Sequence, residues 1–174
     1  LDSAGGLIFA AETSITVETS SGQAVLKGQK IDLKSGSSVK AAGEATVRGY
    51  DSLVLGDKIS VGGSSVSITG GQQAFSLGNN VSLTATNGGI ELLADADATL
   101  GGSLNVNASL KDPSAGDEAP IRIGAQGVLN VTEDKFEVIA ENGSVDIFGG
   151  NRLNIKNDLT IISASDSSLT SENG

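Results

Sequence analysis

The residues best suited to chemistry in this sequence are four acids. Asp95 and Asp97 are separated by one alanine, and Asp117 and Glu118 follow further along the chain. In a strand, residues i and i+2 point to the same side, which would place the first two carboxylates about 7 Å apart. Carboxylate oxygens on a flexible loop suit Ca²⁺, so these four acids are the candidate calcium ligands. A solvated acidic face is the simpler interpretation of the same residues.

Most other site chemistry lacks the residue types that it needs. The chain contains no His, Cys, Met or Trp, which excludes His- or Cys-based catalytic triads and argues against zinc and haem sites. Arg48, Arg122 and Arg152 stand apart in the sequence, whereas glycan-cleaving enzymes need acids clustered with basic residues. The glycines separate short apolar runs and do not form a phosphate-binding loop before a helix. We therefore expect a protein that is not an enzyme, with no catalytic residue and no cofactor.

Four N-glycosylation sequons suggest the compartment. They begin at Asn80, Asn107, Asn130 and Asn142. A glycan at such a site requires the secretory route and a surface position. The sequons favour a glycoprotein located outside the cell or on its surface.

The charge balance limits the partners. The chain has 21 acidic and 11 basic residues and a net charge of −10. The basic residues are scattered, so neither nucleic acid nor an anionic membrane surface is an expected partner. The longest apolar run, at residues 7–11, is far shorter than the roughly 18 residues of a membrane span. Because strand-like sequence begins at the first residues, the chain also fits an internal piece of a longer protein.

Short alternating segments dominate the sequence. In residues 136–165, apolar and polar residues alternate, and Asn-Gly or Gly-Gly pairs interrupt each run after a few positions. This period of two predicts strands, and the interruptions predict sharp corners. No window of eleven or more residues keeps a helical apolar stripe without a glycine. The fold class is therefore expected to be all-β.

The alternating segment recurs along the chain. Residues 81–85 match residues 136–140 and continue in the same register, and a weaker third copy begins at Ile15. Such recurrence is the signature of a β-solenoid, which we expect to be one domain spanning residues 1–174. Three strands per turn would use roughly 22–25 residues, giving seven or eight turns. A parallel β-helix of one chain and an intertwined trimer both fit the pattern.

One segment departs from the alternation. Residues 111–120 contain both prolines of the chain and no strand pattern. Proline cannot donate a hydrogen bond to a sheet ladder, so we expect an inserted loop that bulges from the rod. The loop is either a tolerated insertion or a binding element that presents itself to a receptor or a glycan.

The two ends of the predicted rod show no evident cap. Uncapped solenoid ends expose strand edges, which favours self-assembly into a homo-oligomer or filament, or pairing with related β-helical chains. The predicted assembly residues are Leu7, Ile8, Phe9, Leu159, Ile161 and Ile162.

The segment from Asp134-Lys135-Phe136-Glu137-Val138 to Leu153-Asn154-Ile155 resembles the extracellular part of the β-, γ- and δ-sarcoglycans. The resemblance covers about a third of the chain and implies a β-helix in which three chains intertwine beside a membrane anchor. The family's cysteine cluster is absent here. The rhythm is also similar to that of phage and secretion-system spikes and of filamentous adhesins.

These observations favour a structural protein that forms repeat units of an extracellular filament, spike or adhesion stalk. A binding or adhesion module that displays the loop at 111–120 is the alternative. A membrane-anchored, sarcoglycan-like complex subunit is a further one.

Overall fold

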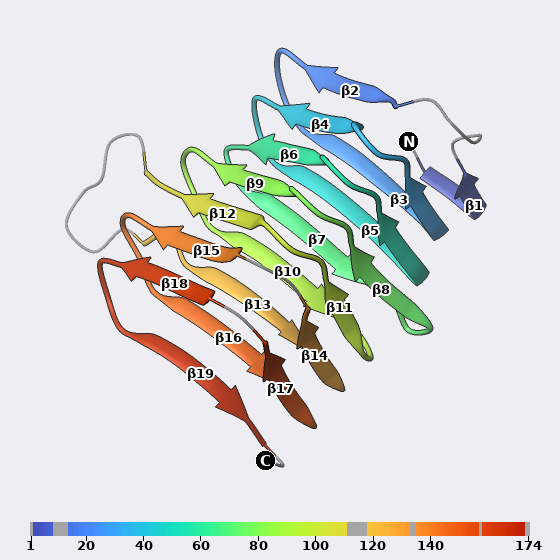
Figure 1. Ribbon diagram of the computed structural model, residues 1–174. Helices are drawn as coiled ribbons and strands as arrows, with labels where there is room; N and C mark the ends of the chain where they lie inside the picture. The colour runs from blue at the N-terminus through green and yellow to red at the C-terminus, as the bar shows by residue number, and fades with distance from the viewer. Residues whose placement is uncertain (1, 9–13, 111–117, 133–134, 157, 173–174) are drawn as a thin grey trace.

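The chain forms a stack of parallel β-strands. The computed structural model describes residues 2–8, 14–110, 118–132, 135–156 and 158–172, and all elements within them are strands. Every strand pair is parallel, and the two ends of the chain lie at opposite ends of the stack (Figure 1). The predicted all-β solenoid is confirmed.

Each complete coil contributes strands to three faces. The first face is a seven-stranded sheet that runs in chain order from one end of the stack to the other. Its strands are β2 (Thr16–Thr19), β4 (Ser38–Ala41), β6 (Ser60–Gly63), β9 (Ser82–Ala85), β12 (Leu104–Ala108), β15 (Lys135–Ala140) and β18 (Asp158–Ser163).

The other two faces belong to a twelve-stranded sheet that bends around a corner. The second face consists of the first halves of β3 (Ala24–Leu33) and β5 (Ala45–Leu55), with β7 (Val66–Gly70), β10 (Ile90–Ala94), β13 (Ile121–Ala125), β16 (Val145–Gly149) and β19 (Ser167–Ser171). The third face consists of the second halves of β3 and β5, with β8 (Ala74–Leu77), β11 (Ala98–Leu100), β14 (Val128–Val131) and β17 (Arg152–Ile155). The first strand, β1 (Asp2–Ile8), pairs with β3.

The coil repeats every 22 residues over its first turns. Thr16 pairs with Ser38, Ser38 with Ser60, and Ser60 with Ser82. Later coils are longer, most of all where the segment at 111–117 is inserted between β12 and β13. The described chain makes about six turns, and the predicted seven or eight is wrong.

The long-range sequence repeat reflects coil stacking within one chain. Leu83 pairs with Val106, which pairs with Val138, so the repeat joins positions two coils apart on the first face. All these pairings lie within a single chain, so the single-chain form of the two predicted solenoids is the one observed.

Columns of inward-pointing apolar side chains fill the interior. On the first face one column runs through all seven strands, and its five central members have no exposed surface. The column consists of Val17, Val39, Val61, Leu83, Val106, Val138 and Ile161. Stacking of like residues in adjacent coils excludes water from the interior of the central coils and is the main source of stability.

The corners differ from those expected at two glycines. Gly28 and Gly49 are two of the glycines that separate short apolar runs in the sequence, but neither ends a strand, because β3 and β5 each continue through them. A Cβ placed on Gly49 would lie 2.2 Å from the backbone oxygen of Ser52. Glycine is therefore required there for a tight bend that does not end the strand.

At the corner before the first face, the residue at the same position in successive coils adopts the left-handed backbone conformation. The backbone φ angle is 79° at Gly36, 57° at Lys58, 57° at Asn80 and 55° at Ser103. Only the first of these residues is a glycine, so three L-residues hold a conformation that costs them energy.

Candidate functional site

The acid pair that suggested calcium lies in a corner. Asp95 and Asp97 follow β10 and precede β11, so the prediction that they share one side of a strand is wrong. The Asp97 Oδ1 atom accepts a hydrogen bond from the backbone N–H of Val128 in the next coil, at 2.7 Å. This carboxylate therefore ties two coils together.

Glu118 lies far from this pair. It precedes β13, whose first residue Ile121 pairs with Ile90 at the start of β10, whereas Asp95 follows the end of β10. At the usual strand rise, the five residues of β10 separate the two acids by about 16 Å or more. Asp117 lies outside the described residues. Within the described ranges, no three acidic side chains gather into a metal-binding group.

A ladder of polar side chains occupies the corner before the first face. The Ser35 hydroxyl accepts a hydrogen bond from the N–H of Asp57 at 3.1 Å, and the Asp57 carboxylate accepts one from the N–H of Asn79 at 2.7 Å. The Asn79 amide oxygen then accepts one from the N–H of Gly102 at 2.8 Å. Sequence reasoning missed this ladder, although the 22-residue spacing of its members was the available signal.

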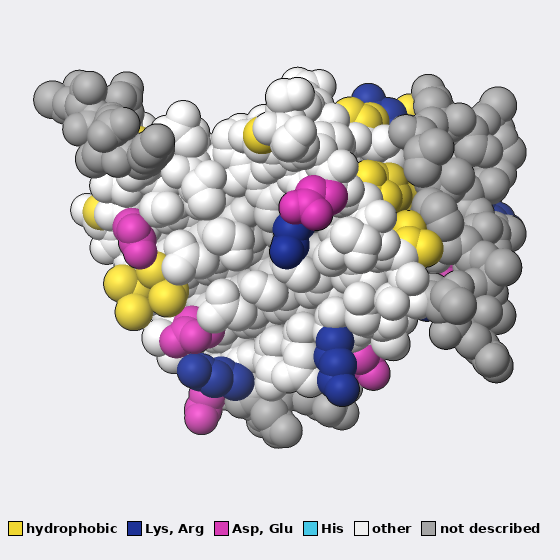
Figure 2. All heavy atoms as spheres, turned by 90° about the horizontal axis from the view of Figure 1, so that it is seen from above, with side chains coloured by type: hydrophobic (Ala, Val, Ile, Leu, Met, Phe, Trp, Pro, Cys, Tyr) yellow, Lys and Arg dark blue, Asp and Glu magenta, His cyan; other side chains and the backbone are white. Residues whose placement is uncertain are grey.

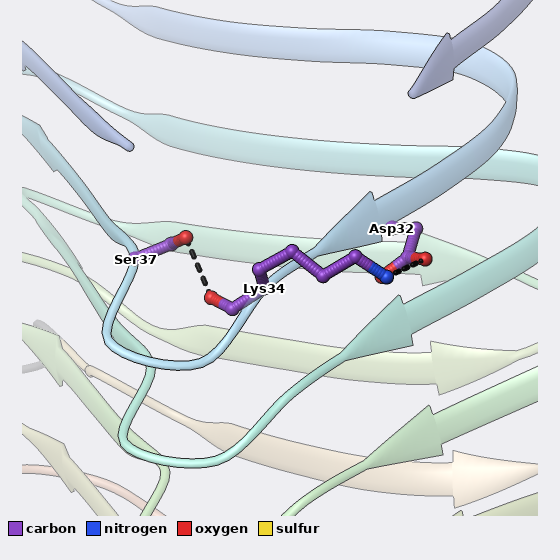
Figure 3. Close-up of polar contacts among 3 residues, drawn as sticks. All are labelled: Asp32, Lys34 and Ser37. Atoms are coloured by element: carbon purple, nitrogen blue, oxygen red, sulfur yellow. Dashed lines mark hydrogen bonds and ion pairs between the residues drawn. The ribbon is translucent and has the colours of Figure 1, made fainter. Parts of the chain in front are cut away.

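A buried serine forms a related contact near the first coil. Ser37 is 1% exposed; its hydroxyl donates to the Lys34 carbonyl oxygen at 2.6 Å and accepts from the N–H of Ile15 at 3.1 Å. Figure 3 shows this contact beside the ion pair of Lys34 and Asp32, 2.5 Å apart. The ion pair is more than a third exposed, so it adds little to stability. The serine hydroxyl instead provides the Ile15 N–H with a hydrogen-bond acceptor in a buried position.

The four sequon asparagines lie in different settings. Asn80 is exposed at a left-handed corner, whereas Asn107 and Asn130 are half-buried in β12 and β14. The Asn130 side-chain oxygen accepts a hydrogen bond from the side-chain amide of Asn154 at 2.8 Å. Among the four, Asn80 is therefore the most open to a bulky modification.

Asn142 holds both stems of the inserted loop. Its side-chain oxygen accepts a hydrogen bond from the N–H of Leu110 at 3.0 Å, and its backbone oxygen accepts one from the N–H of Ala119 at 3.1 Å. Residues 111–117 between these stems lie outside the described part of the chain. The anchor thus fixes where the loop leaves and rejoins the stack.

The face of the molecule seen in Figure 2 is mostly uncharged. Figure 2 shows a face made largely of neutral polar side chains and backbone, with charged side chains scattered over it. On the second face, Arg122 lies 3.9 Å from the Asp146 carboxylate and 5.8 Å from the Phe148 ring centre. Arg122, one of the three arginines that stand apart in the sequence, thus has an acidic partner in the fold. This ion pair is exposed and therefore weak.

The predicted assembly residues lie on terminal strands. Leu7 and Ile8 belong to β1 and pair with β3, while Phe9 lies outside the described residues. At the other end Leu159 and Ile161 are half-buried, and Ile162 is 54% exposed. Leu169 of β19 is also exposed at this end, by 52%. It pairs with the buried Ile147 and therefore occupies an inward position of its strand.

Comparison with known proteins assigns no family to this arrangement. No protein-family model, curated protein or solved structure matches the chain. The resemblance to the sarcoglycans therefore remains a prediction. In the described ranges, none of the secondary structure is a helix with the length and apolarity needed to cross a membrane.

Proposed function

We propose that the chain is a non-enzymatic structural protein. It forms a rod-like repeat unit of an extracellular filament, spike or adhesion stalk, and its copies join through stacked β-coils. The location outside the cell is proposed from the sequons alone.

The observation that carries this proposal is the exposure of the interior at both edges of the seven-stranded sheet. The central members of the inward column on that sheet have no exposed surface, whereas Val17 and Ile161 at its two ends are half-buried. Each end residue lacks a neighbouring coil on one side among the described strands. A further coil would cover apolar surface at either end and complete the backbone hydrogen bonding of an edge strand.

The use of the polar groups supports the same function. The corner residues Ser35, Asp57 and Asn79 bind backbone N–H groups of the next coil, and so does Asp97. These side chains hold neighbouring coils in register, which a rod of stacked coils requires.

Negative-stain electron microscopy combined with sedimentation velocity tests this function. We expect the purified chain to form rods whose length grows with protein concentration. Ile161→Lys should abolish growth, because the substitution would bury a charge under the next coil. Thr160→Lys, on the outer surface of the same strand, is the matched control and should preserve it. Discrete single-chain particles at all concentrations would refute the proposal.

The anchored loop supports a second function, namely binding of a receptor or a glycan. Its stems are fixed by Asn142, and rigidly held loops commonly carry binding residues. Replacing residues 111–117 with a short Gly-Ser linker separates the two functions. A structural rod should assemble unchanged, whereas a binding module should lose its ligand on a glycan array.

A further inference from the structure

We propose that two copies join head to tail in one defined register, with β18 of one copy pairing in parallel with β2 of the next. The inference rests on the proposed function and specifies its joint. The occupant of the exposed edge of β18 is therefore a second copy of this chain.

The strand edges are compatible at this joint. Among the described strands, β2 and β18 are the two edge strands of the seven-stranded sheet, and both run in the same direction. Stacking β2 on β18 would thus repeat the parallel pairing that joins every neighbouring strand within the sheet. The new contact is continuous with the coil-to-coil interface already present in the chain.

The inward residues determine the register. If the coil pattern continues, Ile161 of one copy stacks on Val17 of the next, just as Ile161 stacks on Val138 within its own copy. Both residues are apolar and half-buried at the ends, so this register covers both. A shift by one residue would place Glu18 against the apolar column, at a high cost for its charge.

The outward residues allow the same register. Ile162 would lie beside Glu18, and Thr160 beside Thr16, so these outward positions bring no like charges together across the β18–β2 pair. The net charge of −10 on each copy still opposes association. We expect assembly to strengthen with salt, because salt screens this repulsion while burial of apolar surface persists.

Paired cysteines test the register, since the native chain has none. Neighbouring parallel strands place their backbones about 4.8 Å apart, within the range that a disulfide spans. Glu18→Cys combined with Ile162→Cys should give a ladder of covalent multimers on mild oxidation. Thr84→Cys with Asn107→Cys is the control, because these residues pair within one copy and should cross-link without forming multimers.

The shifted pair distinguishes this register from other joints. Thr16→Cys with Ile162→Cys lies two residues out of register and should form at least several-fold fewer multimers. Equal yields of covalent multimers from the two cysteine pairs would overturn the proposed register. Rods seen by microscopy without cross-links in the Glu18 and Ile162 variant would also overturn it, while leaving the structural function intact. Absence of rods under all conditions would overturn both.

Discussion

At the scale of single residues, the corner before the first face carries the clearest strain. Lys58 has a φ of 57°, a conformation that L-residues adopt at a cost and glycine adopts freely. Its N–H donates to the Asn79 carbonyl oxygen at 2.8 Å, so the surrounding corner holds it there. The equivalent position one coil earlier is Gly36, which shows that the corner accepts glycine.

We therefore expect Lys58→Gly to raise the free energy of unfolding, by about 0.5–1 kcal/mol after the greater freedom of glycine in the unfolded chain is included. Urea denaturation measures this change. Lys40→Gly is the matched control, because it removes the same charge from an extended strand position and should lower stability by about as much. A loss of stability from Lys58→Gly that equals the loss in the control would contradict the strain argument.

At the scale of the elements, the sequence predicts the strands better than the corners. Alternation of Val, Ile and Leu with polar residues predicts the strands of the first face because each inward side chain is buried by the next coil. The same rule fails at residues 94–98, where Ala and Asp alternate as in a strand but the chain turns between β10 and β11. Periodicity alone does not reveal which alternating segments pair with a neighbouring coil.

The polar ladder of Ser35, Asp57 and Asn79 was missed for a related reason. Side-chain oxygens that accept backbone hydrogen bonds from the next coil are recognised only once the coil register is known. The bends of β3 and β5 are not evident from the sequence either, since a glycine in a strand marks either a break or a bend. The candidate calcium ligands lie close together in the sequence, but residues that are close in the sequence of a solenoid can lie at opposite ends of a strand, as Asp95 and Glu118 do.

The bend in β5 gives a prediction at this scale. Gly49→Ala places a methyl group against the Ser52 backbone oxygen, 2.2 Å from the ideal Cβ position, so either the bend or the pairing of β5 must shift. We expect a loss of about 1–3 kcal/mol in the free energy of unfolding, as for other overpacked sites. Gly62→Ala in β6, with its closest contact at 3.6 Å, is the control and should change stability by less than about 0.5 kcal/mol. Equal effects of the two substitutions in thermal or urea unfolding would show that the bend tolerates a side chain.

At the scale of the whole molecule, a solenoid of nearly identical coils gains stability from each coil and from each contact between coils. Its interior is the same column of apolar residues at every level, so an exposed end resembles a cut through the core. This similarity of ends and interior connects the fold to the proposed function. A rod built in this way is lengthened by adding copies, without any new type of contact.

The central claim is that one chain coils on itself, with neighbouring coils one strand spacing apart. Pulsed electron paramagnetic resonance tests it by measuring the distance between spin labels at Thr16→Cys and Thr160→Cys, both of which are exposed on the first face. The sample is diluted with unlabelled chain to suppress distances between copies. Six coil steps separate the two sites, so the backbone distance should be about 29 Å. In an intertwined trimer, each chain rises by one strand spacing at each of the three faces, and therefore by three spacings per turn. The same six turns would then separate the two sites by about 86 Å. The shorter distance would support the single-chain coil, and the longer one would contradict it.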